Sequence, residues 1–318
     1  MGVTMAASLS ALPSDILVVN SVTLLDERAR QRVVIAGSHG GRIAAYLAAQ
    51  AGVRAIILND AGVGKDQAGI AGLDDLAQLG TAAATVARAA VPMGNGQAML
   101  TAPISHVNEI AQSLGVVVGQ PAQVAAQLLR RAPLACAKPI QVQEGRYSLY
   151  PFDPAYPDAP TVSGCDSICL LSPGDQGSIV IIGSHAALHA GPESALPIAA
   201  FAAIFHDAGC QDSRLDPEGI SRLPVLSERG IPAATVDYRS ARIGDACSMY
   251  LTGVLSHVNT AALHIGLRPL MPVQRAVMQL RQQALAWATL ARPMMAQPAT
   301  TNHHNPTLFG QEGVWSAK

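Results

Sequence analysis

Short apolar runs alternate along this chain with glycine-rich turns and with longer alanine-rich or amphipathic segments. The clearest example begins with the apolar run Val33–Ala36, which turns through Gly37–Gly41 into the alanine-rich segment Arg42–Gln50. A second apolar run, Arg54–Leu58, follows and ends in the polar loop Asn59–Asp66. Short apolar runs between turn residues are typical of buried strands, and the longer segment is typical of a helix. We therefore expect strand, glycine turn, helix, strand and glycine turn over this stretch.

The same pattern predicts further elements on either side. Strands alternating with helices indicate βαβ crossovers and a mainly parallel sheet. A short polar turn, Asp26–Gln31, leads from the first strand into the second, so an antiparallel first pair is one alternative. The expected strands lie near 16–25, 32–36, 54–58 and 82–86, and the expected helices near 41–51, 67–79, 95–114 (with a break at Pro103 as an alternative) and 121–131.

Two segments of the chain resemble each other. The matching stretches keep nearly constant spacing, which is the pattern of a tandem duplication. We therefore predict an α/β fold made of two similar α/β units with mainly parallel sheets, related by a pseudo-two-fold axis. The correspondences are Asn20–Leu25 with Asp166–Leu171, Val33–His39 with Ile179–His185, Asp60–Gly62 with Asp207–Gly209, Ala83–Val86 with Ala233–Val236, and Ser105–Asn108 with Ser256–Asn259.

This duplication defines the expected domains. The first repeat spans 15–131 and the second spans 164–282, and a C-terminal helix with a polar tail spans 283–318. The connector at 132–163 is rich in aromatic residues and prolines, so we expect an extended segment on the surface or over a cleft.

Two details of the second repeat and of the tail need separate interpretation. The first helix of the second repeat stays open, because Gly191, Pro192 and Pro197 interrupt it. We interpret His303 and His304 as part of the polar tail, since metal ligands need a rigid frame.

Composition narrows the class of protein. Of 318 residues, 49% are hydrophobic and 14% are charged, which is typical of a globular protein with a large core. A net charge of −1 and 4% aromatic residues predict neither nucleic acid nor an anionic membrane as partner. No apolar run reaches the roughly 18 residues of a membrane helix, and we expect no signal peptide.

Cysteine usage favours a reducing compartment. Five cysteines are scattered along the chain without a CxxC motif. We therefore expect a cytoplasmic protein without a disulfide framework and without a cysteine-based zinc site.

The candidate site follows from the expected sheet, because ligands of parallel α/β sheets bind outside the carboxyl ends of the strands. The loop after the second strand contains Ser38 and His39, followed by Gly40 and Gly41 at the start of a helix. Glycines allow close backbone approach, and a helix N-terminus suits a phosphate, a carboxylate or an oxyanion. In the alternative interpretation, Ser38 only caps the helix and the glycines permit a tight turn.

The loop after the third strand carries an acid, an amide and a lysine. Asp60 is a candidate general base or metal ligand, and Lys65 a candidate anion binder or base. Asn59 and Gly64 complete this loop as candidate substrate contacts. The alternative is a solvated loop whose Asp–Lys ion pair contributes little.

Polar residues shared by both repeats would line a cleft between them. Ser105 and Ser256 are expected to begin a helix as N-caps. Some polar residues, including His206 and Arg239, occur only in the second repeat. We therefore expect a single active site to which the two repeats contribute different residues. The shared polar pairs are Ser38/Ser184, His39/His185, Asp60/Asp207, Thr85/Thr235, His106/His257 and Asn108/Asn259.

These arguments assign the candidate roles. Four residues are candidates for catalysis: Ser38, His39, Asp60 and Lys65. Eleven residues are candidates for substrate binding: Gly40, Gly41, Asn59, Gly64, His106, Ser184, His185, His206, Asp207, Arg239 and His257.

The favoured function is a cofactor-independent hydrolase of a small polar or anionic substrate such as an amide, lactam or ester. Ser38 would be the nucleophile, or Asp60 or His39 would activate water, while Lys65 and loop N–H groups would stabilise the oxyanion. The first alternative is a hydrolase that uses a divalent metal held by His39, Asp60 and His106, although no HExxH motif supports it.

Further alternatives also stand. The protein could be a non-enzymatic small-molecule binding protein whose lobes close on an anionic ligand, or an isomerase or lyase that transfers protons through Asp60 and Lys65. A homo-oligomer is among the expectations.

Overall fold

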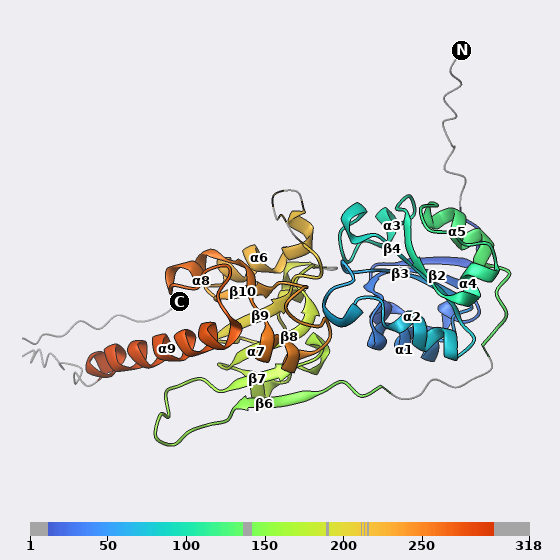
Figure 1. Cartoon of the computed structure of the whole chain (residues 1–318). Coiled ribbons are helices and arrows are strands. Elements are labelled where there is room, and N and C mark those ends of the chain that lie inside the picture. Colours follow the sequence, from blue (N-terminus) through green and yellow to red (C-terminus); the bar gives the residue numbers. More distant parts are fainter. Residues whose placement is uncertain are drawn as a thin grey trace, which may run out of the picture.

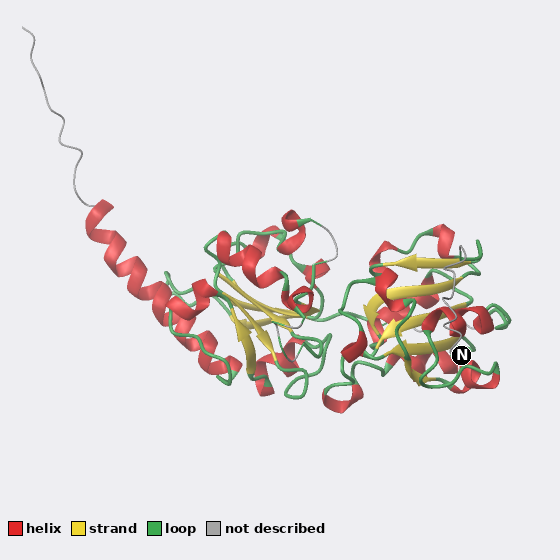
Figure 2. Ribbon diagram, turned by 90° about the horizontal axis from the view of Figure 1, so that it is seen from above, coloured by secondary structure: helices red, strands yellow, loops and turns green. Residues whose placement is uncertain are grey.

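The computed structural model describes residues 12–295, apart from 136–141, 189–190, 211, 213 and 215. The polar tail with His303 and His304 therefore lies outside the described residues. We call residues 12–135 the first lobe and residues 142–295 the second lobe. Figures 1 and 2 show these lobes side by side, each built around its own sheet.

The first lobe contains a five-stranded sheet with helices on both faces. Its strands are neighbours in chain order; the first four are parallel and the last is antiparallel. Nearly every residue of the central strands is buried and apolar, as expected for a sheet covered on both sides. Helices α1 and α2 pack on one face, and α3, α4 and α5 pack on the other. The elements are β1 (Ile16–Val19), β2 (Val33–His39), α1 (Arg42–Gln50), β3 (Ala55–Asn59), α2 (Gly72–Gln78), β4 (Ala82–Val86), α3 (Gly96–Met99), β5 (Ile104–Val107), α4 (Glu109–Ser113) and α5 (Ala122–Leu129).

The second lobe contains a six-stranded sheet of similar plan. Four central strands, β7 to β10, are parallel, and β6 and β11 are antiparallel edge strands. Helix α6 covers one face and α7, α8 and α9 the other. The elements are β6 (Arg146–Tyr150), β7 (Val162–Cys165), β8 (Ile179–His185), β9 (Ala202–His206), α6 (Arg222–Glu228), β10 (Ala233–Val236), α7 (Ala246–Thr252), β11 (Leu255–Val258), α8 (Thr260–His264) and α9 (Val273–Met295).

Two mixed, mostly parallel sheets with helices confirm the α/β class. Their details match in several places: Ile16 pairs with Val33 in the first sheet as Val162 pairs with Ile179 in the second. The segment expected as a connector supplies β6, which pairs with β7. No helix in the described part of the chain combines the length and apolar character needed to cross a membrane.

Three features of the first lobe differ from what the sequence pattern indicated. Strand β1 is parallel to β2, because residues 20–32 form a crossover with two 3-10 turns, Val22–Leu24 and Glu27–Ala29, rather than a hairpin. It also ends at Val19, well before the expected boundary. The helix expected over 95–114 is replaced by α3, β5 and α4.

A fourth difference concerns the Ser-His-Val-Asn stretches, which occur in both lobes. The expected helix starts at Ser105 and Ser256 are wrong, because Ser105 lies in β5 and Ser256 lies in β11. The helices begin after Asn108 and Asn259, whose side chains accept the capping hydrogen bonds from Ala111 and Ala262.

Candidate functional site

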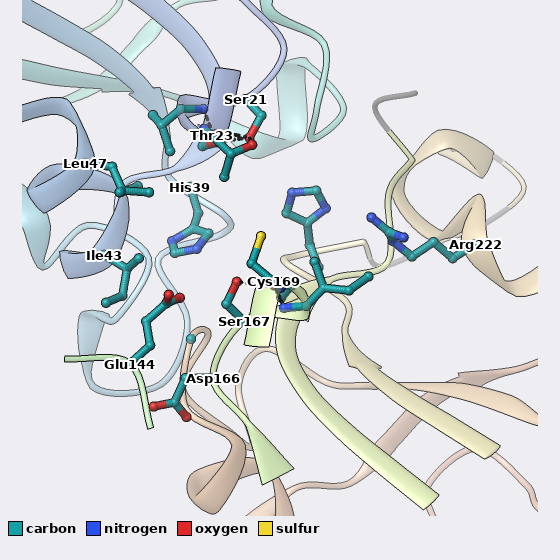
Figure 3. A pocket seen from close by; sticks show the side chains of 17 residues that line it. Ser21, Thr23, His39, Ile43, Leu47, Glu144, Asp166, Ser167, Cys169 and Arg222 are labelled. Atoms are coloured by element: carbon teal, nitrogen blue, oxygen red, sulfur yellow. Dashed lines mark hydrogen bonds between the residues drawn. The ribbon is translucent and has the colours of Figure 1, made fainter. Parts of the chain in front are cut away.

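A cavity of about 310 Å³ lies between the two lobes. It is lined by the carboxyl ends of β2 and β8, by the turns that follow β1 and β7, and by the apolar face of α1 (Figure 3). A second cavity of about 320 Å³ adjoins the first. Four residues line both cavities: His39, Ile43, Asp166 and Gly244. This is the edge at which parallel α/β sheets bind ligands.

His39 ends β2 and extends into this cavity (Figure 3). Its Nδ1 accepts a hydrogen bond from the Gly41 N–H at 3.1 Å, so the neutral ring carries its proton on Nε2. Burial, together with the charge of a protonated His206, lowers the pKa of His39 to about 4. His39 is therefore a neutral hydrogen-bond donor near pH 7. His185 lines the same cavity from β8, and its Nδ1 accepts from Ala187 at 3.2 Å.

The two glycines after His39 are accounted for by contacts within the protein. A Cβ on Gly41 would lie 2.6 Å from the His39 Nδ1, so this glycine lets the ring fold back over the start of α1. A Cβ on Gly40 would lie 2.8 Å from the Gly69 carbonyl oxygen. Both glycines thus position protein groups, and no ligand is needed to explain them.

Two carboxyl groups line the cavity near His39. Burial raises the pKa of Asp166, and burial together with the charge of Asp166 raises the pKa of Glu144. Main-chain N–H groups hold both oxygens of Asp166, from Ala246 at 2.9 Å and Gly145 at 2.6 Å. Glu144 interacts instead with the Ser167 side chain. Glu144 is therefore the freer of the two to exchange a proton.

The serines before the histidines support neighbouring turns. The buried Ser38 hydroxyl accepts from the Val22 N–H at 3.0 Å and donates to Ser21 at 3.4 Å. The Ser184 hydroxyl accepts from the Ile168 N–H at 3.0 Å. Both hydroxyls line the cavity, and each fixes the turn after the adjacent strand.

Asn59 and His206 perform the same structural task in the two lobes. The Asn59 side chain accepts from Ala61 at 2.9 Å and donates to the Val91 carbonyl at 3.3 Å. The His206 ring accepts from Ala208 at 3.0 Å and donates to the Ala241 carbonyl at 3.1 Å. Neither residue lines the two cavities described above.

The paired acids Asp60 and Asp207 also hold main-chain groups. One oxygen of Asp60 accepts from the N–H groups of Gly62 and Arg88, each at 2.9 Å. One oxygen of Asp207 accepts from Gly209 and Tyr238, each at 3.0 Å. Burial raises the pKa of Asp207 to about 7. These carboxylates organise loops away from the cavity.

His106 and His257 lie in polar clusters away from the cavity. The His106 Nδ1 is 4.0 Å from an Asp60 oxygen and 3.4 Å from the Thr85 hydroxyl. The His257 Nδ1 is 3.2 Å from the Thr235 hydroxyl, and burial lowers the pKa of His257.

These clusters bear on the metal alternative. Three His, Cys, Asp or Glu side chains placed to share a metal ion are not found among the described residues. His39, Asp60 and His106, the ligands of the metal-dependent alternative, are accordingly not brought together.

Lys65 and Gly64 join the lobes. The Lys65 N–H donates to the Tyr238 carbonyl at 2.8 Å, and its ammonium donates to Thr252 at 2.8 Å and to the Ser240 carbonyl at 3.3 Å. Gly64 adopts a φ of 70°, and a Cβ there would lie 3.0 Å from the Tyr238 carbonyl oxygen. The polar loop that suggested catalysis is therefore an inter-lobe contact.

Two further ion pairs flank this contact. Buried Arg88 donates to the Ala208 carbonyl at 3.0 Å and pairs with Asp216 across the lobes. Arg239 is exposed, pairs with Asp237 at 2.6 Å and lies over the Tyr238 ring. Arg239 lines neither cavity.

Among the cavity residues that local motifs did not reveal are Glu144, Asp166, Cys169 and Arg222. Glu144 lies in the expected connector, outside both repeats. In the sequence alignment of the two segments, Cys169 is aligned with Thr23 and Arg222 with Gly72, so a comparison of the aligned positions that differ could have found them. Comparison of the chain with family models, curated proteins and solved structures finds no match.

Proposed function

We propose that the protein is a cofactor-independent hydrolase of a small amide, lactam or ester, and that the cavity between the lobes is its active site. The observation that carries this proposal is the pairing in one cavity of a neutral imidazole donor, His39, with a carboxyl group, Glu144, whose pKa is raised. A donor for a developing oxyanion and a base for water are the two groups that hydrolysis without a covalent enzyme intermediate requires.

In the proposed reaction, the ionised Glu144 carboxylate takes a proton from water as the water oxygen attacks the substrate carbonyl carbon. The His39 Nε2–H donates to the oxyanion of the tetrahedral intermediate. Glu144 then returns its proton to the leaving nitrogen or oxygen as the C–N or C–O bond breaks. A neutral His39 suits this role, because it donates without itself losing charge in a partly desolvated site.

We also propose that the two lobes arose by duplication and are related by a pseudo-two-fold axis. The support is a set of matched contacts: both sheets have a bulge at the corresponding residues Thr85/Val86 and Thr235/Val236. The two lobes would contribute different residues to a single active site, since Glu144 and Arg222 both come from the second lobe. The four described cysteines are free thiols, which fits our proposal of a cytoplasmic protein. We also propose that the protein forms a homo-oligomer.

A panel of small amides, lactams and esters tests the function. Glu144→Gln should lower kcat on the substrate found by a factor of about 100 or more, because general-base catalysis typically contributes that much. The matched control is Glu228→Gln, which changes an exposed glutamate at the end of α6. In the wild type, kcat/KM should rise with pH through the pKa of Glu144, which lies above its ordinary value of 4.5, since only the ionised base is active.

Two outcomes count against this proposal. The first is a panel without any hydrolysis. The second is full turnover by a folded Glu144→Gln variant, with folding checked by circular dichroism.

A further inference from the structure

Arg222 is almost completely buried, with 2% of its surface exposed, and it lines the cavity between the lobes. It begins α6, and Figure 3 shows its guanidinium group pointing toward the cavity from the side of the second lobe. A buried arginine normally faces a carboxylate, because an isolated charge loses its hydration on burial.

Arg222 faces no such carboxylate. Its Nη1 donates to the carbonyl oxygens of Ser194 and Ala195, each at 2.6 Å, and its Nε is buried without a hydrogen-bond partner. Within the described part of the chain, no Asp or Glu carboxylate oxygen lies within 4.0 Å of a nitrogen of the Arg222 guanidinium, so Arg222 forms no ion pair there. The Phe205 ring, 5.6 Å away, offers only partial compensation. The guanidinium therefore keeps donors for an anion that the described residues do not supply.

The two lobes differ at this position for a clear reason. Gly72 of the first lobe donates to the Gly40 carbonyl at 2.8 Å, as Arg222 donates to the Ala186 carbonyl at 2.9 Å. A Cβ on Gly72 would lie 2.6 Å from the Ala45 Cβ, because α1 packs closely there. After β8, the described residues form the 3-10 turn Pro192–Ala195 in place of an α-helix. This change leaves room for a long side chain.

We propose that Arg222 binds the carboxylate of the substrate, so that the substrate class is a small monocarboxylate carrying a hydrolysable amide or ester. This inference rests on the proposed hydrolase function. Ile43 and Leu47 of α1 supply an apolar wall for the body of such a molecule. Glu144 and Asp166 line the same cavity, and their charge disfavours a dianion such as a phosphate monoester.

A matched pair of probes tests this proposal: N-acetylalanine, which has a carboxylate, and N-acetylalaninamide, which is uncharged. Isothermal titration of the wild-type protein should give a Kd at least ten times lower for the carboxylate, since an arginine–carboxylate pair adds charge-assisted hydrogen bonds. Arg222→Gln should abolish this preference, and Arg222→Lys should retain part of it because it keeps the charge. The control is Arg229→Gln, at the exposed end of the same helix, where the guanidinium donates to the Pro192 carbonyl.

Equal wild-type affinities for the two probes would overturn the carboxylate assignment, and this result needs no variant. A preference that persists in folded Arg222→Gln would overturn it as well. Acetate or ammonia released from the probes is assayed in the same samples and reports turnover separately from binding, so the two proposals fail separately. Carboxylate selectivity without hydrolysis of any panel compound contradicts only the hydrolase, and hydrolysis without carboxylate selectivity contradicts only the role of Arg222.

Discussion

Asn59 and His206 are the last residues of β3 and β9. Each side chain, an amide in one case and an imidazole in the other, accepts a hydrogen bond from the main-chain N–H two residues later and donates one to a distant carbonyl. Alignment of the repeats predicted their correspondence. It could not predict their hydrogen-bond partners, because an amide or imidazole in a strand-end loop has the same local pattern in a binding site. The partners that decide the role, the Val91 and Ala241 carbonyls, lie about 30 residues away in sequence.

This correspondence predicts an acid-stable variant. Burial lowers the pKa of His206 to about 4, below its ordinary value of 6.5. Between these two pH values the unfolded chain binds more protons, so the free energy of unfolding falls as the pH decreases from 6.5 to 4. The variant His206→Asn keeps both hydrogen bonds but has no ring to protonate. Its free energy of unfolding should therefore fall by up to about 3 kcal/mol less than that of the wild type between pH 6.5 and pH 4. Urea unfolding at several pH values measures it, with the exposed His264→Asn as control.

The comparison of variant with wild type reports the contribution of His206 together with its effect on His39, whose pKa is lowered by burial and by the charge of His206. His39 shifts in the same direction, and Asp207, whose pKa is raised to about 7, acts in the opposite direction. Both groups are present in each protein. An unchanged slope of stability against pH in His206→Asn would contradict the assignment.

At the level of elements, most strands and the helices α1 and α5 could be predicted from the sequence, because their apolar periodicity is strong. The Ser-His-Val-Asn stretches were misinterpreted because a serine before polar residues resembles a helix cap. Tertiary pairing decides otherwise, since Thr85 pairs with His106 across β4 and β5. The capping residue is Asn108, three positions later.

Asn108 should therefore be important for the stability of the first lobe. Its buried side chain accepts from Ala83 and Ala111, each at 3.0 Å, and donates to the Thr81 carbonyl at 2.9 Å. Asn108→Ala leaves these groups buried without partners and should lower the free energy of unfolding by about 3 kcal/mol or more. Chemical denaturation measures the loss.

A second helix cap provides the comparison for Asn108. Asn95 caps α3 through a single exposed hydrogen bond to Ala98, so Asn95→Ala should cost only about 1 kcal/mol. Similar losses in the two variants would show that Asn108 is no more than a cap.

At the level of the whole molecule, the α/β class followed from the sequence, but the contacts between the lobes did not. Local pattern made Lys65 a catalytic candidate, whereas its ammonium donates to Ser240 and Thr252 of the other lobe. Such contacts depend on how two separately folded sheets pack, and no periodicity encodes that. The same packing brings His39 together with Glu144 and Arg222, which are distant in sequence.

The most direct test of the cavity as an active site is kcat/KM for His39→Ala on the substrate identified from the panel. His39 is proposed to stabilise the oxyanion, and loss of one such donor typically lowers kcat by a factor of about 100 to 1,000. The control, His264→Ala, changes an exposed histidine of α8 and should leave kcat/KM at the wild-type value. A folded His39→Ala protein with wild-type kcat/KM would contradict the placement of catalysis in the cavity between the lobes.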